Sequence, residues 1–123
     1  MSLRTKRIYD SPSPEDGYRL LVMRRWPRGI RKQAVDSWER ELSPSEPLRV
    51  AYRRGNMPWE EYARRYVEEV SPKRELLAQV ARRARSQPVT LLCSCVDETR
   101  CHRSLLRGLV EGVANLDGGP AFA

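Results

Sequence analysis

The 123 residues of this chain suffice for one ordinary domain with a single hydrophobic core and are too few for large multidomain machinery. Hydrophobic residues make up 40% and charged residues 32% of the chain, which excludes a disordered polyelectrolyte. The net charge of +7 favours anionic partners but does not choose between a nucleic acid and a small molecule. With no run of about 20 apolar residues and no signal peptide, we expect a cytoplasmic protein that does not enter a membrane.

Two strands are predicted in the first quarter of the chain. One covers Thr5 to Tyr9 and ends at a loop that contains two prolines and a glycine. The second covers Tyr18 to Trp26, because the apolar run Leu20-Leu21-Val22-Met23 continues until Pro27 approaches. No helix separates the two strands, so antiparallel pairing is favoured.

Helical patterns occupy the middle of the chain, where apolar residues recur at intervals of three and four. We expect helices over Ala34 to Leu42, over Glu46 to Arg54, from Pro58 to Val70, and from Ser71-Pro72 to a point before Pro88. These helices form a crossover that is long enough to bring the next strand parallel to the second one.

The next strand is predicted over Val89 to Cys95, a continuous apolar run of the kind that is covered on both faces of a sheet. A last helix begins at Thr99 or Cys101. The predicted fold class is α/β: a small single domain over residues 1–115, with a few-stranded mixed sheet, helices packed around it and a strand-loop-helix unit near the C-terminus. Residues 116–123 are expected to form a short flexible tail.

The loop before the last helix carries the residues that are best suited to chemistry. Open α/β sheets bind ligands at the carboxyl ends of their strands, and Cys101 and His102 fall in the first turn of the predicted helix. Unpaired N–H groups there favour a thiolate or a bound anion. We hypothesise that His102 is a general acid–base group and that Cys101 is a nucleophile or modulator. The alternative is that both side chains only fill the core.

Zinc is a further hypothesis for the same segment. Cys93, Cys95, Cys101 and His102 are four plausible ligands, but they lack the separated pairs that are usual in structural zinc sites. A rhodanese-like loop from Cys95 to Arg100 is a weak match, because its interior has no glycine and contains two acids. The leading interpretation therefore includes no metal and no cofactor.

A basic block covers Met23 to Lys32, where five basic residues occur without an acid. Pro27 and Gly29 favour a fixed turn that would hold Arg24 and Arg28 rigidly as a site for a small anion. The same block also fits a nucleic-acid surface with Trp26 as a stacking platform, or a strand end with solvated arginines.

Several of these motifs together resemble the YeaO-like proteins of the domain of unknown function 488 family. They are Arg24-Arg25-Trp26-Pro27-Arg28-Gly29, Leu42-Ser43-Pro44-Ser45, Leu48-Arg49 and Cys101-His102-Arg103. The resemblance implies a compact α/β domain in which the family motif positions are matched by Arg24, Trp26, Arg28, Ser45, Arg49 and His102. Members often have aspartate in place of Met23, and many have Asn-His-Ala in place of Cys101-His102-Arg103. The resemblance therefore makes His102, and not Cys101, the candidate for a shared catalytic group.

The leading functional hypothesis is an enzyme or ligand-binding domain for a small anionic molecule, phosphorylated or nucleotide-like. The anion would be held by Arg24, Arg28, Arg49 and Arg103, in a pocket that includes Trp26 and Ser45. The alternative is a nucleic-acid-binding module that uses the block from Arg24 to Lys32. A structural zinc site at the cysteine cluster is the third hypothesis.

Overall fold

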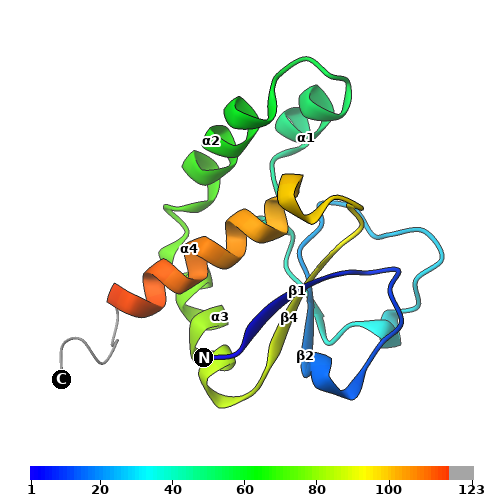
Figure 1. The fold of residues 1–123 in the computed structure, drawn as a ribbon, viewed down its shortest axis with the longest axis vertical. Coiled ribbons are helices and arrows are strands. Elements are labelled where there is room, and N and C mark those ends of the chain that lie inside the picture. Colours follow the sequence, from blue (N-terminus) through cyan, green and yellow to red (C-terminus); the bar gives the residue numbers. More distant parts are fainter. Residues whose placement is uncertain (117–123) are drawn as a thin grey trace.

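The computed structural model describes residues 1–116 (Figure 1). The strands are β1 (Leu3–Arg7), β2 (Tyr18–Leu21), β3 (Ser37–Trp38) and β4 (Val89–Cys93). The helices are α1 (Glu46–Arg53), α2 (Trp59–Val70), α3 (Arg74–Ser86) and α4 (His102–Leu116). The tail predicted over residues 116–123 lies outside the described residues, except for Leu116 at the end of α4. None of the described helices is long and apolar enough to cross a membrane.

The four strands form one sheet in the order β1-β4-β2-β3, and every pair is parallel. The mixed sheet predicted from the sequence is therefore wrong. All five residues of β4 are buried between its two neighbours, as predicted for a central strand. The predicted parallel pairing of this strand with the second one is also confirmed, with Tyr18 opposite Val89 and Leu21 opposite Leu92.

The antiparallel pairing predicted for the first two strands is wrong, because β1 and β2 are parallel and lie on either side of β4. The ten residues from Ile8 to Gly17 connect them without an α-helix. Ten residues reach up to about 33 Å, and a five-residue strand is only about 17 Å long, so such a loop suffices for the return. Asp16 ends the loop as a buried carboxylate that accepts hydrogen bonds from Lys6 of β1 and Arg19 of β2.

The helix predicted over Ala34 to Leu42 is also wrong, since this segment contains β3 between two 3-10 turns. Its apolar residues are divided between the two faces of the sheet. Val35 and Trp38 pack on one face, whereas Leu42 belongs to the core on the other face. A single helix has only one apolar stripe, so it would not serve both faces.

The other helices lie close to their predicted positions. α1 matches its prediction to within one residue, and α2 begins directly after Pro58. α3 begins at Arg74, three residues after the predicted start, because Ser71 and Pro72 form a turn. Two of the predicted strands are shorter in the structure, since β2 ends at Leu21 and β4 at Cys93.

The sheet is covered by helices on one face and by loops on the other (Figure 1). The larger core joins β2 and β4 to all four helices, with Tyr66, Leu77, Leu91, Leu106 and Val110 fully buried. The smaller cluster on the opposite face packs Ile8, Leu21 and Leu92 against side chains of residues 23–38. The carboxyl ends of β2 and β4 therefore lie side by side, and α1, α2 and the start of α4 stand nearby.

Candidate functional site

A cavity of about 340 Å³ opens beside the carboxyl ends of β2 and β4. This is the edge at which open parallel sheets bind ligands. The cavity is lined by residues that follow β2 and β4, by the start of α4 and by side chains of α1 and α2, namely Met23, Arg24, Arg25, Pro44, Arg49, Tyr52, Arg53, Tyr62, Cys93, Ser94, Cys95, Arg100 and His102. A larger hollow of about 490 Å³ near Tyr18 and Arg83 has no cysteine or histidine in its lining.

His102 lies at the floor of this cavity and is almost fully buried. Its Nε2 is 2.5 Å from the carbonyl oxygen of Val22. Because a carbonyl only accepts, Nε2 carries the proton and Nδ1 presents its lone pair. Nδ1 is 3.9 Å from Sγ of Cys93 and 3.9 Å from Sγ of Cys101. Burial lowers the pKa of His102, and the bond to Val22 offsets this only in part, which keeps the ring neutral near pH 7.

Three free cysteines cluster beside His102, and two of them, Cys93 and Cys101, lie next to its Nδ1. The three Sγ atoms lie within 4.8 Å of one another, and those of Cys93 and Cys95 are 3.7 Å apart. Cys93 and the half-buried Cys95 line the cavity, whereas the buried Cys101 lies behind its floor. The contact between the Cys93 and Cys101 side chains lowers the pKa of Cys93 and raises the pKa of Cys101. The cluster therefore favours one thiolate, at Cys93.

Arg103 lies behind the floor and does not line the cavity. Its side chain is only 4% exposed, and Nη1 donates to the carbonyl of Cys95 at 2.9 Å and to Sγ of Cys101 at 3.5 Å. Nε is buried and has no hydrogen-bond partner among the described residues, and its carboxylate neighbour Glu98 stands 4.0 Å away and is half exposed. The sequence predicts an anion-binding role for Arg103, whereas the structure places its charge against the thiols.

Arginine dominates the rim, which has no acidic residue among the described residues that line the cavity. Arg49 of α1 contacts Glu46 at 2.5 Å, and Arg25 contacts the same carboxylate at 3.1 Å. The hydrogen bond from Arg49 is the main cause that lowers the pKa of Glu46 to about 2. Arg53 and Arg100 are exposed at the rim.

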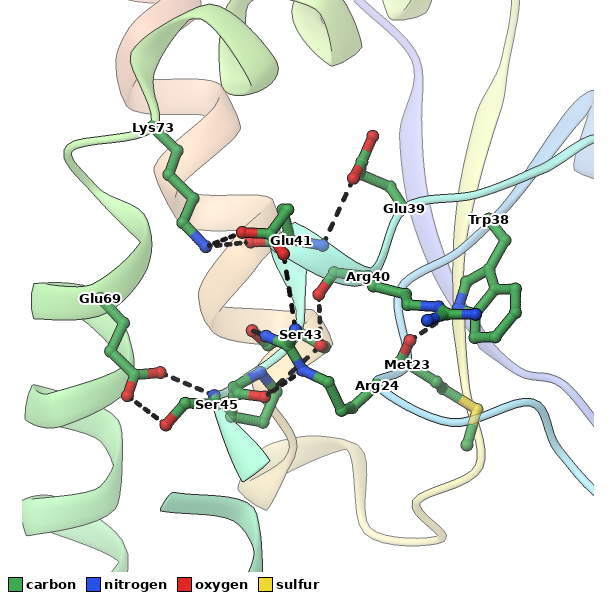
Figure 2. Close-up of polar contacts among 11 residues, drawn as sticks. Met23, Arg24, Trp38, Glu39, Arg40, Glu41, Ser43, Ser45, Glu69 and Lys73 are labelled. Atoms are coloured by element: carbon green, nitrogen blue, oxygen red, sulfur yellow. Dashed lines mark hydrogen bonds and ion pairs between the residues drawn. The ribbon is translucent and has the colours of Figure 1, made fainter. Parts of the chain in front are cut away.

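Arg24 reaches the cavity while it also holds the segment that leads into α1 (Figure 2). Its Nε donates to the carbonyl of Pro44 at 3.1 Å, and Nη2 donates to that of Ser43 at 3.3 Å. Nη1 is 3.5 Å from Glu41. A guanidinium has five N–H donors, so these three contacts leave donors for a ligand.

Two tyrosines form an aromatic wall of the cavity. The rings of Tyr52 and Tyr62 stack with centroids 4.3 Å apart and planes at 19°. Burial raises the pKa of Tyr62, so its hydroxyl stays protonated. Behind this wall, the buried Tyr66 donates to the carbonyl of Leu42 at 2.7 Å and contacts the His102 ring.

Trp26 and Arg28 lie away from the cavity that they were predicted to form. Trp26 packs on the opposite face of the sheet, where its Nε1 donates to the carbonyl of Ile30 at 2.7 Å and its ring meets Trp38 edge-on at 5.3 Å. Arg28 is exposed, and its carbonyl accepts the hydroxyl of Tyr9 at 2.9 Å.

Ser45, also predicted as a pocket residue, caps α1 instead. Its Oγ accepts the backbone N–H of Leu48, and both its N–H and its Oγ contact the carboxylate of Glu69 on α2 (Figure 2). Ser45 thus fixes the start of α1 against α2 and does not line the cavity. Of the predicted site residues, His102, Arg24 and Arg49 line one cavity.

Some cavity residues have no role in the sequence-based hypotheses. Tyr52 and Arg53 fall within the helix predicted over Glu46 to Arg54, and Tyr62 falls within the helix predicted from Pro58 to Val70, with no further role. The spacing of Arg49 and Arg53 contained a usable pattern, because residues four apart share one face of a helix. Nothing in the spacing indicated that this face meets the end of β4.

The fold and the cavity together define a parallel α/β domain with a basic cavity over a cluster of thiols and an imidazole. The profile described as "Active DUF488-N3 subclade" matches residues 3–113, and the chain belongs to the DUF488 family as a YeaO-like protein. It is 37% identical over 108 residues to Uncharacterized protein YeaO of Escherichia coli (strain K12), and the aligned region covers 86% of this chain and 94% of YeaO. It is 35% identical over 112 residues to Uncharacterized protein Rv3073c of Mycobacterium tuberculosis (strain ATCC 25618 / H37Rv), and the aligned region covers 89% of this chain and 94% of that protein. No solved structure matches significantly. The predicted family resemblance is confirmed.

Proposed function

We propose that this protein binds a small anionic molecule, phosphorylated or nucleotide-like, in the cavity beside the ends of β2 and β4. One observation carries the proposal. Arg24, Arg49 and His102 come from three separate segments of the chain and line the same cavity. Such convergence of polar groups in a partly apolar hollow is typical of a small-molecule site.

The charge of the rim supports an anionic ligand. Five arginines line the cavity, and the two glutamates that pair with three of them, Glu41 and Glu46, do not line it. Arg53 and Arg100 add positive charge at the rim. Guanidinium groups bind phosphate and carboxylate through two parallel hydrogen bonds, so a rim of this kind favours those groups over neutral ligands.

The size and the aromatic wall narrow the ligand further. A volume of about 340 Å³ is at the lower end of the range for small-molecule pockets, so it suits one small molecule rather than a polymer. The stacked pair of Tyr52 and Tyr62 offers a flat surface for a planar ring, beside the arginines that would hold the anionic group. A mononucleotide combines both features.

The predicted acid–base role of His102 is restricted to one nitrogen. Nε2 is bonded to Val22, so a proton transfer would have to use Nδ1, which faces Cys93 and Cys101. The half-buried Cys95 is the thiol most accessible to a ligand, whereas Cys101 lies behind the floor. A nucleophilic role therefore suits Cys95 better than Cys101.

The test is isothermal titration of the protein with AMP and, as the uncharged control, with adenosine. We expect saturable binding of AMP and at least tenfold weaker binding of adenosine. Arg49→Ala removes a charged hydrogen-bond donor, which is worth about 1.5–3 kcal/mol, so it should weaken AMP binding about 10- to 150-fold.

Arg28→Ala is the matched control, because it removes the same charge from an exposed position outside the cavity. Its affinity for AMP should stay within twofold of the parent. Equal losses in both variants would contradict the proposal, as would the absence of AMP binding. Binding of a single-stranded oligonucleotide that weakens steeply from 50 to 200 mM salt and depends on Arg28 would instead favour the nucleic-acid alternative.

A further inference from the structure

We propose that Cys93, Cys95, Cys101 and Nδ1 of His102 bind one zinc ion at the floor of the cavity. The site goes beyond the anion-binding proposal and does not depend on it, because its ligands differ from the arginines of the rim.

The distances between the donor atoms fit a tetrahedral ion. Zinc bonds of about 2.3 Å to sulfur and about 2.0–2.1 Å to nitrogen place neighbouring sulfurs about 3.8 Å apart and sulfur and nitrogen about 3.6 Å apart. The Cys93 and Cys95 sulfurs are 3.7 Å apart, and Nδ1 is 3.9 Å from two of the three sulfurs. All three sulfurs lie within 4.8 Å of one another. A bound ion would have to draw Cys95 and Nδ1 into the remaining tetrahedral positions.

The orientation of His102 has the form that metal-binding histidines take. Such a histidine donates its second ring N–H to a carbonyl or carboxylate, which fixes the ring and its tautomer. Here Nε2 donates to the buried Val22 carbonyl, so Nδ1 is unprotonated and directed at the sulfurs.

The buried charge of Arg103 is a second, independent observation. Its guanidinium contacts Sγ of Cys101 and the carbonyl of Cys95, and its Nε has no hydrogen-bond partner in the part of the chain that the structure describes. A buried cation is costly without an anion close by, and Glu98 is 4.0 Å away and half exposed. Three thiolates, a neutral imidazole and Zn²⁺ carry one net negative charge, which Arg103 neutralises.

Three elements supply the ligands, and this explains why their spacing does not follow a familiar pattern. Cys93 ends β4, Cys95 follows it by two residues, and Cys101 directly precedes α4, which His102 begins. The exposed residues 96–100 separate the two halves of the site. A zinc ion would tie this loop to the sheet and to α4.

The chemistry of binding is a proton exchange without a redox step. Zn²⁺ forms three bonds to sulfur and one to nitrogen, and the thiol protons leave to solvent. Four protein ligands complete the coordination, which is typical of a structural ion rather than a catalytic one. With zinc on Nδ1, His102 has no nitrogen left for acid–base chemistry, so the metal content also decides its role.

The test uses the full chain, purified under reducing conditions without chelator. Elemental analysis should find about one zinc per chain, and removal of the metal should lower the melting temperature. When Co²⁺ replaces zinc, thiolate-to-cobalt charge-transfer bands and the d–d bands of a tetrahedral ion should appear. Cys95→Ser changes one half-buried sulfur to oxygen and should weaken Co²⁺ binding at least tenfold.

Arg49→Ala is the matched control and should keep the zinc content and the cobalt spectrum, whatever it does to AMP. If the protein binds AMP but does not bind zinc or Co²⁺, only the zinc site is overturned. If it binds the metal but not AMP, only the anion proposal is overturned. The zinc site is refuted if the fully reduced protein, with three titratable thiols, gives no charge-transfer band with excess Co²⁺. It is also refuted if Cys95→Ser binds Co²⁺ as the parent does.

Discussion

Gly17 offers a sharp test of the strand order, because it lies where β2 begins beside β4. Its φ of +62° and ψ of −128° belong to a region that side chains other than glycine rarely adopt. A methyl group there would lie 2.8 Å from Cβ and 2.9 Å from the carbonyl carbon of Pro88, and closer still to its carbonyl oxygen. That oxygen also accepts the N–H of Tyr18 at 2.8 Å. Gly17→Ala therefore pushes β2 away from the residue that leads into β4.

The magnitude combines two costs. The backbone strain of the new side chain is worth about 1–3 kcal/mol, and overpacking against a backbone that cannot rotate away adds about 1–3 kcal/mol. Gly55→Ala has only the strain cost, because Gly55 also has a positive φ of +77° but no described residue lies within 4 Å of its added methyl group. We expect a loss of about 2–6 kcal/mol for Gly17→Ala and about 1–3 kcal/mol for Gly55→Ala, with the overpacking cost of about 1–3 kcal/mol as the difference between them.

The assay is urea denaturation of the parent and of both variants, followed by circular dichroism. With a slope of about 2 kcal/mol per molar urea, a loss of about 4 kcal/mol moves the midpoint by about 2 M. The slope should stay the same, because the same surface is exposed on unfolding. A free energy of unfolding for Gly17→Ala equal to that of Gly55→Ala would refute the close approach of β2 to Pro88, and with it the pairing of β2 with β4.

Two further predictions concern buried polar contacts. Burial raises the pKa of Asp16, but hydrogen bonds from its cationic partners outweigh this effect and lower the pKa below 3.8. The stability that this carboxylate contributes is therefore present above pH 4 and is lost as the pH falls through the pKa of the folded state. Asp16→Asn should cost about 1.5–3 kcal/mol at pH 7 and flatten the acid limb of stability against pH, and an unchanged limb would contradict the assignment. Tyr66→Phe leaves the buried carbonyl of Leu42 without its donor, so denaturation should show a loss of about 1–3 kcal/mol. Tyr9→Phe, which removes an exposed hydroxyl, should change stability by less than about 0.5 kcal/mol, and equal effects in the two variants would count against the Tyr66 contact.

The sequence predicted an element well where its apolar residues matched a single kind of burial, either one stripe of a helix or both sides of a strand. The stripes of α1 and α2 face a single core, and the unbroken apolar run of β4 reflects burial on both sides. The helix predicted around Trp38 was wrong because the apolar residues of this segment pack on opposite faces of the sheet, and their helical spacing alone does not show this. The antiparallel pairing predicted for the first two strands was wrong for a different reason. The loop from Ile8 to Gly17 contains no α-helix, but it still returns the chain to a parallel strand.

The candidate site was predictable only in part. The position of His102 after the central strand followed from the general location of ligand sites in α/β sheets. The basic block did not act as one unit, because Arg24 turns toward the cavity, whereas Trp26 packs on the other face of the sheet. The aromatic wall of Tyr52 and Tyr62 depends on how α1 and α2 pack, and such packing is not readable from periodicity.

His102 is the only histidine in the chain, so its imidazole is a unique reporter at the floor of the cavity. The most direct test of the anion-binding proposal is the proton NMR spectrum of this ring during titration with AMP, with adenosine as control. We predict a saturable shift of its carbon-bound protons with AMP, which needs about 10- to 150-fold more AMP in Arg49→Ala and keeps the parent's midpoint within twofold in Arg28→Ala. Unchanged imidazole resonances at AMP concentrations that saturate binding elsewhere would contradict the proposal that this cavity is the ligand site.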